Sequence, residues 1–251
     1  MPGSVLELTV DGSSMPTYLA VPEGDGPFPG IVVAQHRLGV DVFIRTICDW
    51  LAQAGYVAAA PDIYHRGWSR EQFDKTTAMP RGDNQAEAVL ASLSAALIDS
   101  EIVRDMNAAF IHLKEQPVVD RKSLGVLGFC MGGRIAYLMA TRNASLKGTG
   151  CFYPGNIFES RGGGPSVFAA SDRIESPIIG FTGKDDTNPS PDDMERVGKE
   201  LTRLKVEHDF HLYDGLGHAF MDPTNPQSYI QNVTNDAWTK LIAFYDAKLK
   251  A

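Results

Sequence analysis

The segment GVLGFCMGG, residues 125–133, joins an apolar run to a cluster of glycines. Residues 123–129 predict a short buried strand, and residues 131–141 carry apolar side chains at the spacing of a helix. Cys130 lies between these two elements, on a turn so tight that neighbouring Cβ atoms would clash, and the flanking glycines lack them. The segment therefore predicts a sharp strand–turn–helix with a cysteine at its bend.

Outward from this turn, apolar strands alternate with helices along most of the chain. Residues 5–10 and 17–21 flank Asp11-Gly12 and predict an antiparallel hairpin at the start. The other expected strands are residues 30–34, 56–60, 123–129, 149–153, 177–182 and 209–213. The expected helices are 42–54, 84–114, 131–141, 194–204 and 230–248, and the expected loops are 62–83 and 154–176. This order predicts an α/β fold, with a mostly parallel central sheet and helices on both faces.

Composition sets the broad class of the molecule. Of the 251 residues, 43% are hydrophobic and 22% are charged, which allows a sizeable core and excludes a disordered chain. No repeat, low-complexity tract or linker rich in glycine, proline or serine divides residues 1–251, so one domain is expected.

The net charge and the cysteine content limit which partners, compartments and metal sites are expected. The 31 acidic and 23 basic residues give a net charge of −8, the wrong sign for a nucleic-acid partner. No apolar run reaches the roughly 18 residues of a membrane span, and no basic-then-apolar leader is present, so a cytoplasmic protein without membrane contact is expected. Three widely spaced cysteines suit neither a disulfide framework nor a zinc site, so Cys48 and Cys151 are expected in the core and no metal site is expected.

The position of Cys130 favours reactivity. A helix N-terminus places partial positive charge near the sulfur, which favours the thiolate. The backbone N–H of Met131, the next residue, can point at a developing oxyanion. The alternative is a buried cysteine on a glycine-rich turn that only packs a helix against a strand.

Two further loops carry polar groups to the same predicted edge of the sheet. His218 follows the strand at 209–213, and Asp186 follows the strand at 177–182. Taken alone, His218 is more consistent with a structural loop histidine, and Asp186 is also consistent with a polar turn. Together with Cys130 they have the chain order nucleophile, acid, histidine, which is that of α/β-hydrolases. We expect His218 to accept the thiol proton and Asp186 to orient the imidazole, with Asp185 as the competing acid.

Nearly the whole chain resembles the dienelactone hydrolase family. The matching segments are residues 31–35 with 38–39, 55–62, 125–133, 153–155 and 217–220. The resemblance implies an α/β-hydrolase fold without a cofactor. It also implies cleavage of a small ester or lactone through an acyl-enzyme on Cys130, in a monomer or small homo-oligomer. The second oxyanion donor carried over from the family is the backbone of Arg37, with Leu38 as the fallback.

Two positions depart from the family pattern. His36 stands where the family's dienelactone cleavers have a Glu that contacts the resting thiol, so we expect His218 to activate Cys130 directly, as an ion pair present without substrate. The alternative is that His36 lines the pocket or donates a hydrogen bond to substrate. Asp222 stands where those enzymes have a carboxylate-binding Arg, which favours a neutral ester or lactone as substrate.

The substrate pocket is expected to take residues from several loops. Tyr64 is expected to form one wall, and Tyr153 and Phe220 are expected beside the triad. If the substrate is an anion after all, Arg37, Arg66 or Arg81 would replace the missing family Arg. The alternative activities are a thioesterase or acyl transferase with the same site, or a fold that binds a small ligand without catalysis.

Overall fold

The structure is a computed structural model, and it describes residues 2–75 and 84–250. Eight strands form one sheet in the order β1-β2-β4-β3-β5-β6-β7-β8. The strands are β1 (Ser4–Val10), β2 (Ser13–Ala20), β3 (Phe28–Ala34), β4 (Val57–Pro61), β5 (Val119–Phe129), β6 (Gly148–Phe152), β7 (Ile178–Gly183) and β8 (His208–Tyr213).

The first strands are antiparallel and the others run parallel. β1 pairs with β2 across a turn at Asp11 and Gly12, whose φ angles of 52° and 77° suit a two-residue hairpin. β2 is also antiparallel to β4, and every later pairing, from β4–β3 to β7–β8, is parallel. The expected mostly parallel sheet with an antiparallel start is confirmed.

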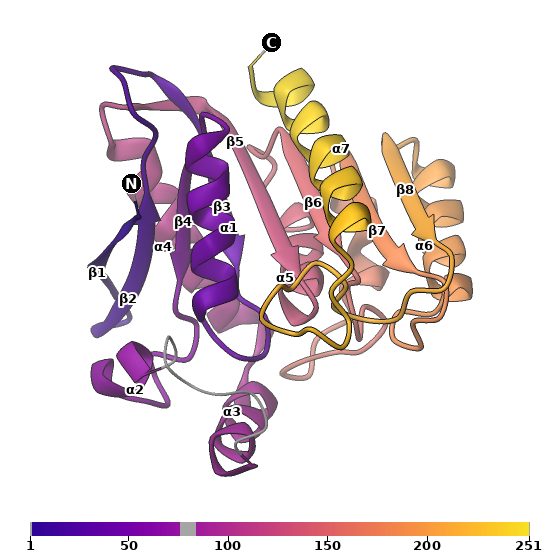
Figure 1. Cartoon of the computed structure of the whole chain (residues 1–251), viewed down its shortest axis with the longest axis horizontal. Helices are drawn as coiled ribbons and strands as arrows, with labels where there is room; N and C mark the ends of the chain where they lie inside the picture. The colour runs from indigo at the N-terminus through magenta and orange to yellow at the C-terminus, as the bar shows by residue number, and fades with distance from the viewer. Residues whose placement is uncertain (1, 76–83, 251) are drawn as a thin grey trace.

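Helices cover both faces of the sheet (Figure 1). They are α1 (Val42–Gln53), α2 (Arg70–Lys75), α3 (Asn84–Ala96), α4 (Asp99–Glu115), α5 (Met131–Ala140), α6 (Pro191–Leu204) and α7 (Gln231–Leu249). α1 and α7 pack on one face, where they share a buried apolar cluster, and α4, α5 and α6 pack on the other. Two cores therefore hold the sheet rigid on either side. None of the described helices is long and apolar enough to cross a membrane.

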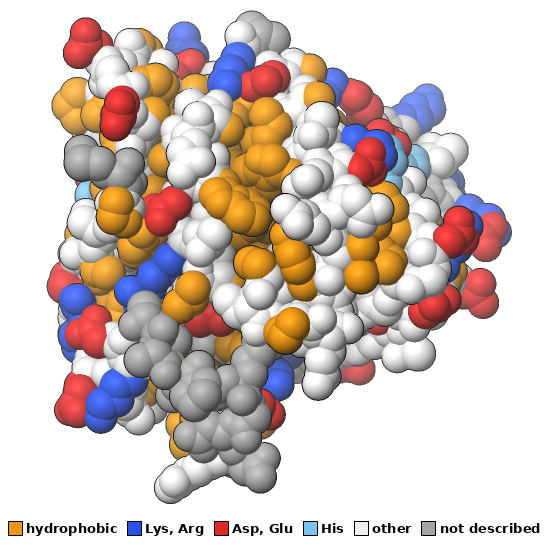
Figure 2. All heavy atoms as spheres, viewed as in Figure 1, with side chains coloured by type: hydrophobic (Ala, Val, Ile, Leu, Met, Phe, Trp, Pro, Cys, Tyr) orange, Lys and Arg blue, Asp and Glu red, His pale blue; other side chains and the backbone are white. Residues whose placement is uncertain are grey.

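Apolar contacts join the two helices on the viewed face. Figure 2 shows hydrophobic side chains between α1 and α7, with acidic and basic side chains mixed around them. One such contact is the edge-to-face pair of Trp50 and Trp238, whose ring centroids lie 5.5 Å apart.

Three segments differ from the sequence-based expectation. The helix expected over 84–114 is two helices, because Ile98 is extended at φ −120° and ψ 140° and begins α4 anew. The carboxylate of Asp99, the next residue, is fixed there by Arg134 of α5. The described part of the 62–83 loop contains α2, and the 154–176 loop contains a short 3₁₀ helix, η1 (Phe168–Arg173).

The parallel strands bring their carboxyl ends to one edge. In Figure 1 the arrowheads of β5, β6, β7 and β8 point the same way, and α3 lies beyond that edge. The loops that follow β3, β5, β6, β7 and β8 therefore meet there, as in other open α/β sheets.

Candidate active site

The turn from β5 into α5 is shaped by close backbone approaches. Cys130 has φ 57° and ψ −121°, a strained conformation for a residue with a side chain. A Cβ on Gly128 would lie 1.9 Å from the carbonyl oxygen of Gly132, and a Cβ on Gly132 would lie 2.2 Å from the carbonyl oxygen of Ala34. No side chain fits at either position, which is why the sequence has glycine there. The turn lifts Cys130 out of the sheet at the start of α5.

The imidazole and the acid predicted from the sequence meet beside this turn. Nδ1 of His218 lies 2.7 Å from Oδ2 of Asp186, and both His218 and Cys130 line the same cavity. The Asp186 side chain is 3% exposed, and its Oδ1 accepts a hydrogen bond from the Asn188 N–H at 2.9 Å. Asp185, the competing acid, is exposed to solvent. Asp186 is thus the carboxylate that lies against the histidine.

Burial and the neighbouring charges act in opposite directions on the Cys130–His218 pair. Burial by itself raises the pKa of the Cys130 thiol, but the hydrogen bond and the positive charge of His218 outweigh it, so this pKa lies below its ordinary value. Burial lowers the pKa of His218, but hydrogen bonds with Asp186 and Cys130 raise it to about 10. Both shifts favour a thiolate–imidazolium ion pair.

The start of α5 and the loop after β3 both border the cavity beside the cysteine. Met131 is the first residue of α5, so its N–H has no partner within the helix. The turn at 36–39 is closed by the Gly39 N–H, which donates to the His36 carbonyl at 3.0 Å. Within that turn, the Tyr64 hydroxyl donates to the Arg37 carbonyl at 2.9 Å and fixes the orientation of the peptide. Met131 and Arg37, the residues expected to supply the oxyanion hole, line the same cavity as Cys130.

A cavity of about 360 Å³ opens over the cysteine. Its walls include Cys130, Met131, Arg37, His218, Arg161 and Asn188. The last two were not expected from the sequence. Arg161 lies in the 154–176 segment, which has no hydrophobic period from which its position could be read. Asn188 accepts the Asn156 N–H at 2.8 Å and so joins that segment to the Asp186 loop.

His36 and Tyr64 were expected to contact substrate, and the structure places both behind the cavity. His36 is buried with its Nε2 2.9 Å from Oδ1 of Asp41, although the contact lacks hydrogen-bond geometry. Its ring packs edge-to-face on Phe43 at 5.5 Å. Burial lowers the pKa of His36, but the charge of Asp41 outweighs burial and raises it. Tyr64 is 2% exposed, and its hydroxyl donates to the Arg37 carbonyl at 2.9 Å and lies 3.9 Å from the Met131 sulfur.

Tyr153 and Phe220 lie under the triad and not in the cavity wall. The Tyr153 ring is 4.8 Å from the His218 ring, and Phe220 packs edge-to-face on Tyr153 at 5.3 Å. Both side chains are buried, so they support the imidazole from the core. Cys48 and Cys151 are buried as expected.

The basic and acidic groups weighed for anion binding also have defined places. Arg66 is held by Asp105, with its Nη1 2.7 Å from Oδ2. Asp222 is 1% exposed, and its Oδ1 accepts the N–H and the hydroxyl of Thr224 at 2.9 and 2.7 Å. Its carboxylate therefore closes its own turn and does not line the cavity. Arg81 lies outside the described residues.

The sheet order, the strained cysteine and the acid and histidine loops together define an α/β-hydrolase. The family model described as "Dienelactone hydrolase family" matches residues 15–249. The chain therefore belongs to the dienelactone hydrolase family, a family of hydrolases.

Individual relatives agree with this assignment. A protein of Synechocystis sp. with the provisional name carboxymethylenebutenolidase is 31% identical over 234 residues, which are 93% of this chain and 92% of the relative. A protein of Methylorubrum extorquens with the same provisional name is 29% identical over 238 residues, 94% of this chain and 78% of the relative. The crystal structure of a provisional dienelactone hydrolase from Klebsiella pneumoniae subsp. pneumoniae superposes with a TM-score of 0.85, at 26% identity and 97% coverage of each chain.

Proposed function

We propose that this protein hydrolyses small esters or lactones, with Cys130 as nucleophile, His218 as general base and acid, and Asp186 as the group that orients His218. The observation that carries the proposal is the continuous chain of contacts from the Cys130 thiol through His218 to Asp186, at the wall of a cavity. The names of the relatives, which refer to a lactone-cleaving enzyme, agree with this class of substrate.

Acylation begins with the thiolate. The Cys130 sulfur attacks the substrate carbonyl carbon and forms a C–S bond, while the carbonyl electrons move to its oxygen. The N–H groups of Met131 and Arg37 stabilise this oxyanion. When the C–O bond breaks, the imidazolium of His218 gives its proton to the departing alcohol oxygen. The product is a thioester on Cys130 and, for a lactone, a ring-opened acyl group.

Deacylation returns the enzyme to its starting state. His218 takes a proton from water, and the resulting hydroxide attacks the thioester carbon. The thiolate leaves, the acid product departs, and Asp186 keeps the imidazolium oriented throughout.

The presence of His36 in place of the family's Glu changes how the Cys130 thiol is deprotonated. An imidazole cannot supply the carboxylate that its position provides in the family's dienelactone cleavers, and here it is turned toward Asp41. We propose that His218 alone draws the proton from Cys130, so that the ion pair exists before substrate arrives. The lowered pKa of Cys130 and the raised pKa of His218 support this proposal.

Intact-mass analysis with 4-nitrophenyl acetate tests the proposal. The wild type should gain the mass of one acetyl group and release nitrophenol in a burst, and Cys130→Ala should show neither, with turnover lower by roughly 1,000-fold or more. Cys151→Ala is the matched control, since its sulfur is buried in the core, and it should still be acetylated. Turnover or acetylation that survives in Cys130→Ala would exclude Cys130 as the nucleophile.

A further inference from the structure

Two histidine–carboxylate pairs come close to Cys130. One is His218 with Asp186, at 2.7 Å, beside the cavity. The other is His36, whose Nε2 lies 2.9 Å from Oδ1 of Asp41. The proposed reaction uses the first pair and leaves the second without a role. Because charged groups are costly to bury, a second buried pair beside the reacting sulfur needs a physical explanation.

The register of the sheet brings His36 next to Cys130. β3 and β5 are parallel neighbours, and Ala34 pairs with Gly128. Extended by two residues on each strand, this register brings His36 level with Cys130, on strands that lie about 4.8 Å apart in a sheet. The start of α5 is also pressed against the end of β3, since a Cβ on Gly132 would lie 2.2 Å from the Ala34 carbonyl oxygen. His36 is therefore a second imidazole beside the sulfur.

The His36 ring is fixed behind the cavity by its neighbours. It packs edge-to-face on Phe43 at 5.5 Å, and Phe43 packs in the same way at 5.1 Å on Phe129, the residue before Cys130. His36 is only 7% exposed, and its carbonyl accepts the Gly39 N–H at 3.0 Å. The imidazole thus approaches the sulfur from the core and not from the side where substrate enters.

Asp41 is held in place to keep this imidazole charged. It precedes α1, and the same Oδ1 that faces His36 accepts the Ile44 N–H at 3.2 Å and so caps the helix. The positive end of the helix dipole favours an ionised carboxylate at this position. An ionised carboxylate in turn favours the protonated form of the imidazole beside it.

The charged groups around His36 come from three segments, with Asp41 before α1, Asp222 after β8 and Cys130 after β5. Burial lowers the pKa of His36, but the two carboxylates and the thiolate outweigh it and raise this pKa. Burial raises the pKa of the Cys130 thiol, and the charge of His36 is one of the influences that lower it. Tyr153 also faces Asp222 and the sulfur, and burial raises its pKa well above the ordinary value, so its hydroxyl stays neutral.

We infer that His36, kept as an imidazolium by Asp41, stabilises the Cys130 thiolate from behind as a second and permanent positive charge. The inference rests on the proposed hydrolase function and adds a positioning residue to it. His36 gives up no proton and touches no substrate. Because His218 gains and loses a proton in each catalytic cycle, only His36 keeps its charge while the thiolate attacks and while it leaves the thioester.

The pH dependence of Cys130 ionisation tests the inference. The ultraviolet absorbance of the thiolate and the rate of iodoacetamide alkylation both measure it. In His36→Gln, the thiolate fraction below the Cys130 pKa should fall about tenfold. The kcat/KM for 4-nitrophenyl acetate should fall equally in that pH range, while its high-pH limit changes by less than about twofold. An equal loss at every pH would show that His36 only holds the loop, and would overturn the inference.

Asp41→Asn provides a second, independent variant. Asparagine caps a helix as well as aspartate does, so α1 should remain, but the amide cannot hold the charge on His36. The thiolate fraction should fall about as much as in His36→Gln, and the double variant should lose no more than either single one. His211→Gln is the matched control, since Nε2 of His211 lies 3.0 Å from Oδ2 of Asp209 on β8, and it should leave Cys130 ionisation unchanged.

His218→Asn separates the two positive charges. In this variant the Cys130 pKa should stay below its ordinary value, and it should return to that value only when His36→Gln is added. A return to the ordinary value in His218→Asn alone would overturn the inference.

The protonation state of His36 gives a test that needs no turnover. The NMR signals of its ring nitrogens should be those of an imidazolium at neutral pH and should change to those of a neutral ring in Asp41→Asn. A neutral ring in the wild type would overturn the inference, even if His36→Gln does not fold. If turnover survives in Cys130→Ala, the proposed hydrolase mechanism fails, whereas this measurement still decides the charge of His36.

Discussion

The turn at residues 128–133 and the segment at residues 154–164 lie on either side of the same cavity, yet they are specified in different ways. In the turn, added Cβ atoms at Gly128 and Gly132 would come within 1.9 and 2.2 Å of backbone oxygens. In the segment, an added Cβ at Gly162 would come within 2.9 Å of the Ile98 side chain, but added Cβ atoms at Gly163 and Gly164 would touch nothing within 4 Å. The turn is determined by contacts between backbone atoms, and the segment is held mainly by side chains, among them that of Arg134, which binds the carbonyls of Asn156 and Glu159.

The difference assigns different tasks to the two regions. The reacting sulfur needs a fixed position relative to His218 and to the oxyanion donors, since small displacements are costly in catalysis. Substrate selection depends on which side chains line the wall, and a loop can change its residues without disturbing the chemistry. We expect variants in the first region to abolish activity or folding, and variants in the second to alter preference.

Asp186→Asn should give the largest effect, a loss of roughly 1,000- to 10,000-fold in kcat. The amide has no negative charge with which to stabilise the imidazolium, and it can favour the wrong tautomer of His218. Steady-state kinetics with 4-nitrophenyl acetate measures the loss. Asp185→Asn is the matched control, because Asp185 is exposed, and it should stay within about twofold of the wild type. Equal losses in the two variants would break the assignment of the acid.

Gly128→Ala should reduce the free energy of unfolding by about 4 kcal/mol, because the new methyl group would overlap the Gly132 carbonyl. Gly164→Ala should change it by less than about 0.5 kcal/mol, since that position is open. Urea unfolding of the two variants measures both values. A comparable loss at Gly164 would remove the contrast between the two regions.

The pH dependence of thiol alkylation sharpens the contrast between Cys130 and the other cysteines. The lowered pKa of Cys130 increases its thiolate fraction at neutral pH, so iodoacetamide should label it about tenfold faster at pH 7 than an ordinary thiol. Burial raises the pKa of Cys48 and Cys151, which should not react in the folded protein. Labelling should slow as the pH falls through the Cys130 pKa, which Asp186→Asn should shift upward. A titration at the ordinary thiol value would contradict direct activation by His218.

The rate of ester hydrolysis should also fall at high pH. The imidazolium that protonates the departing alcohol is lost as the pH rises through the His218 pKa of about 10. Activity should therefore rise with pH through the Cys130 pKa and decline again near pH 10. A rate that keeps rising beyond this pH would show that imidazolium is not needed.

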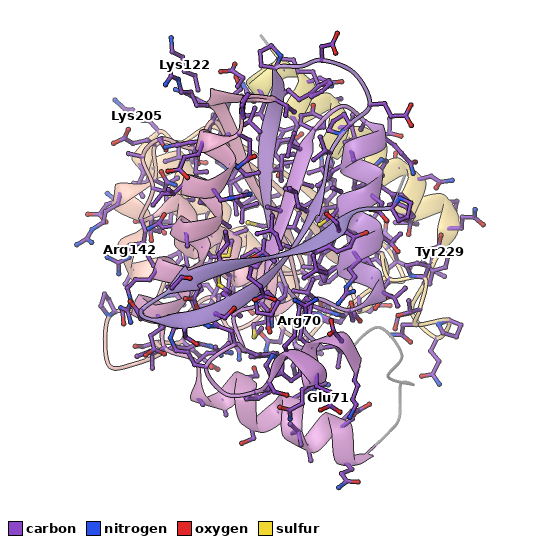
Figure 3. All side chains as sticks on the ribbon, turned by 90° about the vertical axis from the view of Figure 1, so that its left-hand side faces the viewer. Arg70, Glu71, Lys122, Arg142, Lys205 and Tyr229 are labelled. Atoms are coloured by element: carbon purple, nitrogen blue, oxygen red, sulfur yellow. The ribbon has the colours of Figure 1, made fainter. Side chains whose placement is uncertain are left out.

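Tyr64→Phe should give the smallest effect. It removes the hydroxyl that donates to the Arg37 carbonyl, and a lost hydrogen bond of about 1 kcal/mol corresponds to roughly fivefold in kcat with little change in KM. Tyr229→Phe, at a tyrosine that Figure 3 shows at the edge of the molecule, should have no effect. A change in KM alone for Tyr64→Phe would indicate direct contact with substrate, as expected from the sequence.

Secondary structure was predictable where one pattern dominated. The hairpin at Asp11-Gly12 and the alternation of strands and helices were read directly, because turn chemistry and apolar periodicity act within a few residues. The helix break at Ile98 was not predictable, because it accompanies the pairing of Asp99 with Arg134, which is 35 residues away in the sequence. The 3₁₀ helix η1 was not predictable either, because its segment has no periodic pattern of apolar residues.

The sequence alone determined the sheet, the sharp turn at Cys130 and the order of the three groups along the chain, since these depend on local sterics and on the direction of parallel strands. Tertiary structure decided which acid meets His218, that Tyr64 and His36 lie behind the cavity, and that Arg161 enters its wall. Those outcomes depend on which distant side chains satisfy one another when buried, and no local pattern records such pairings.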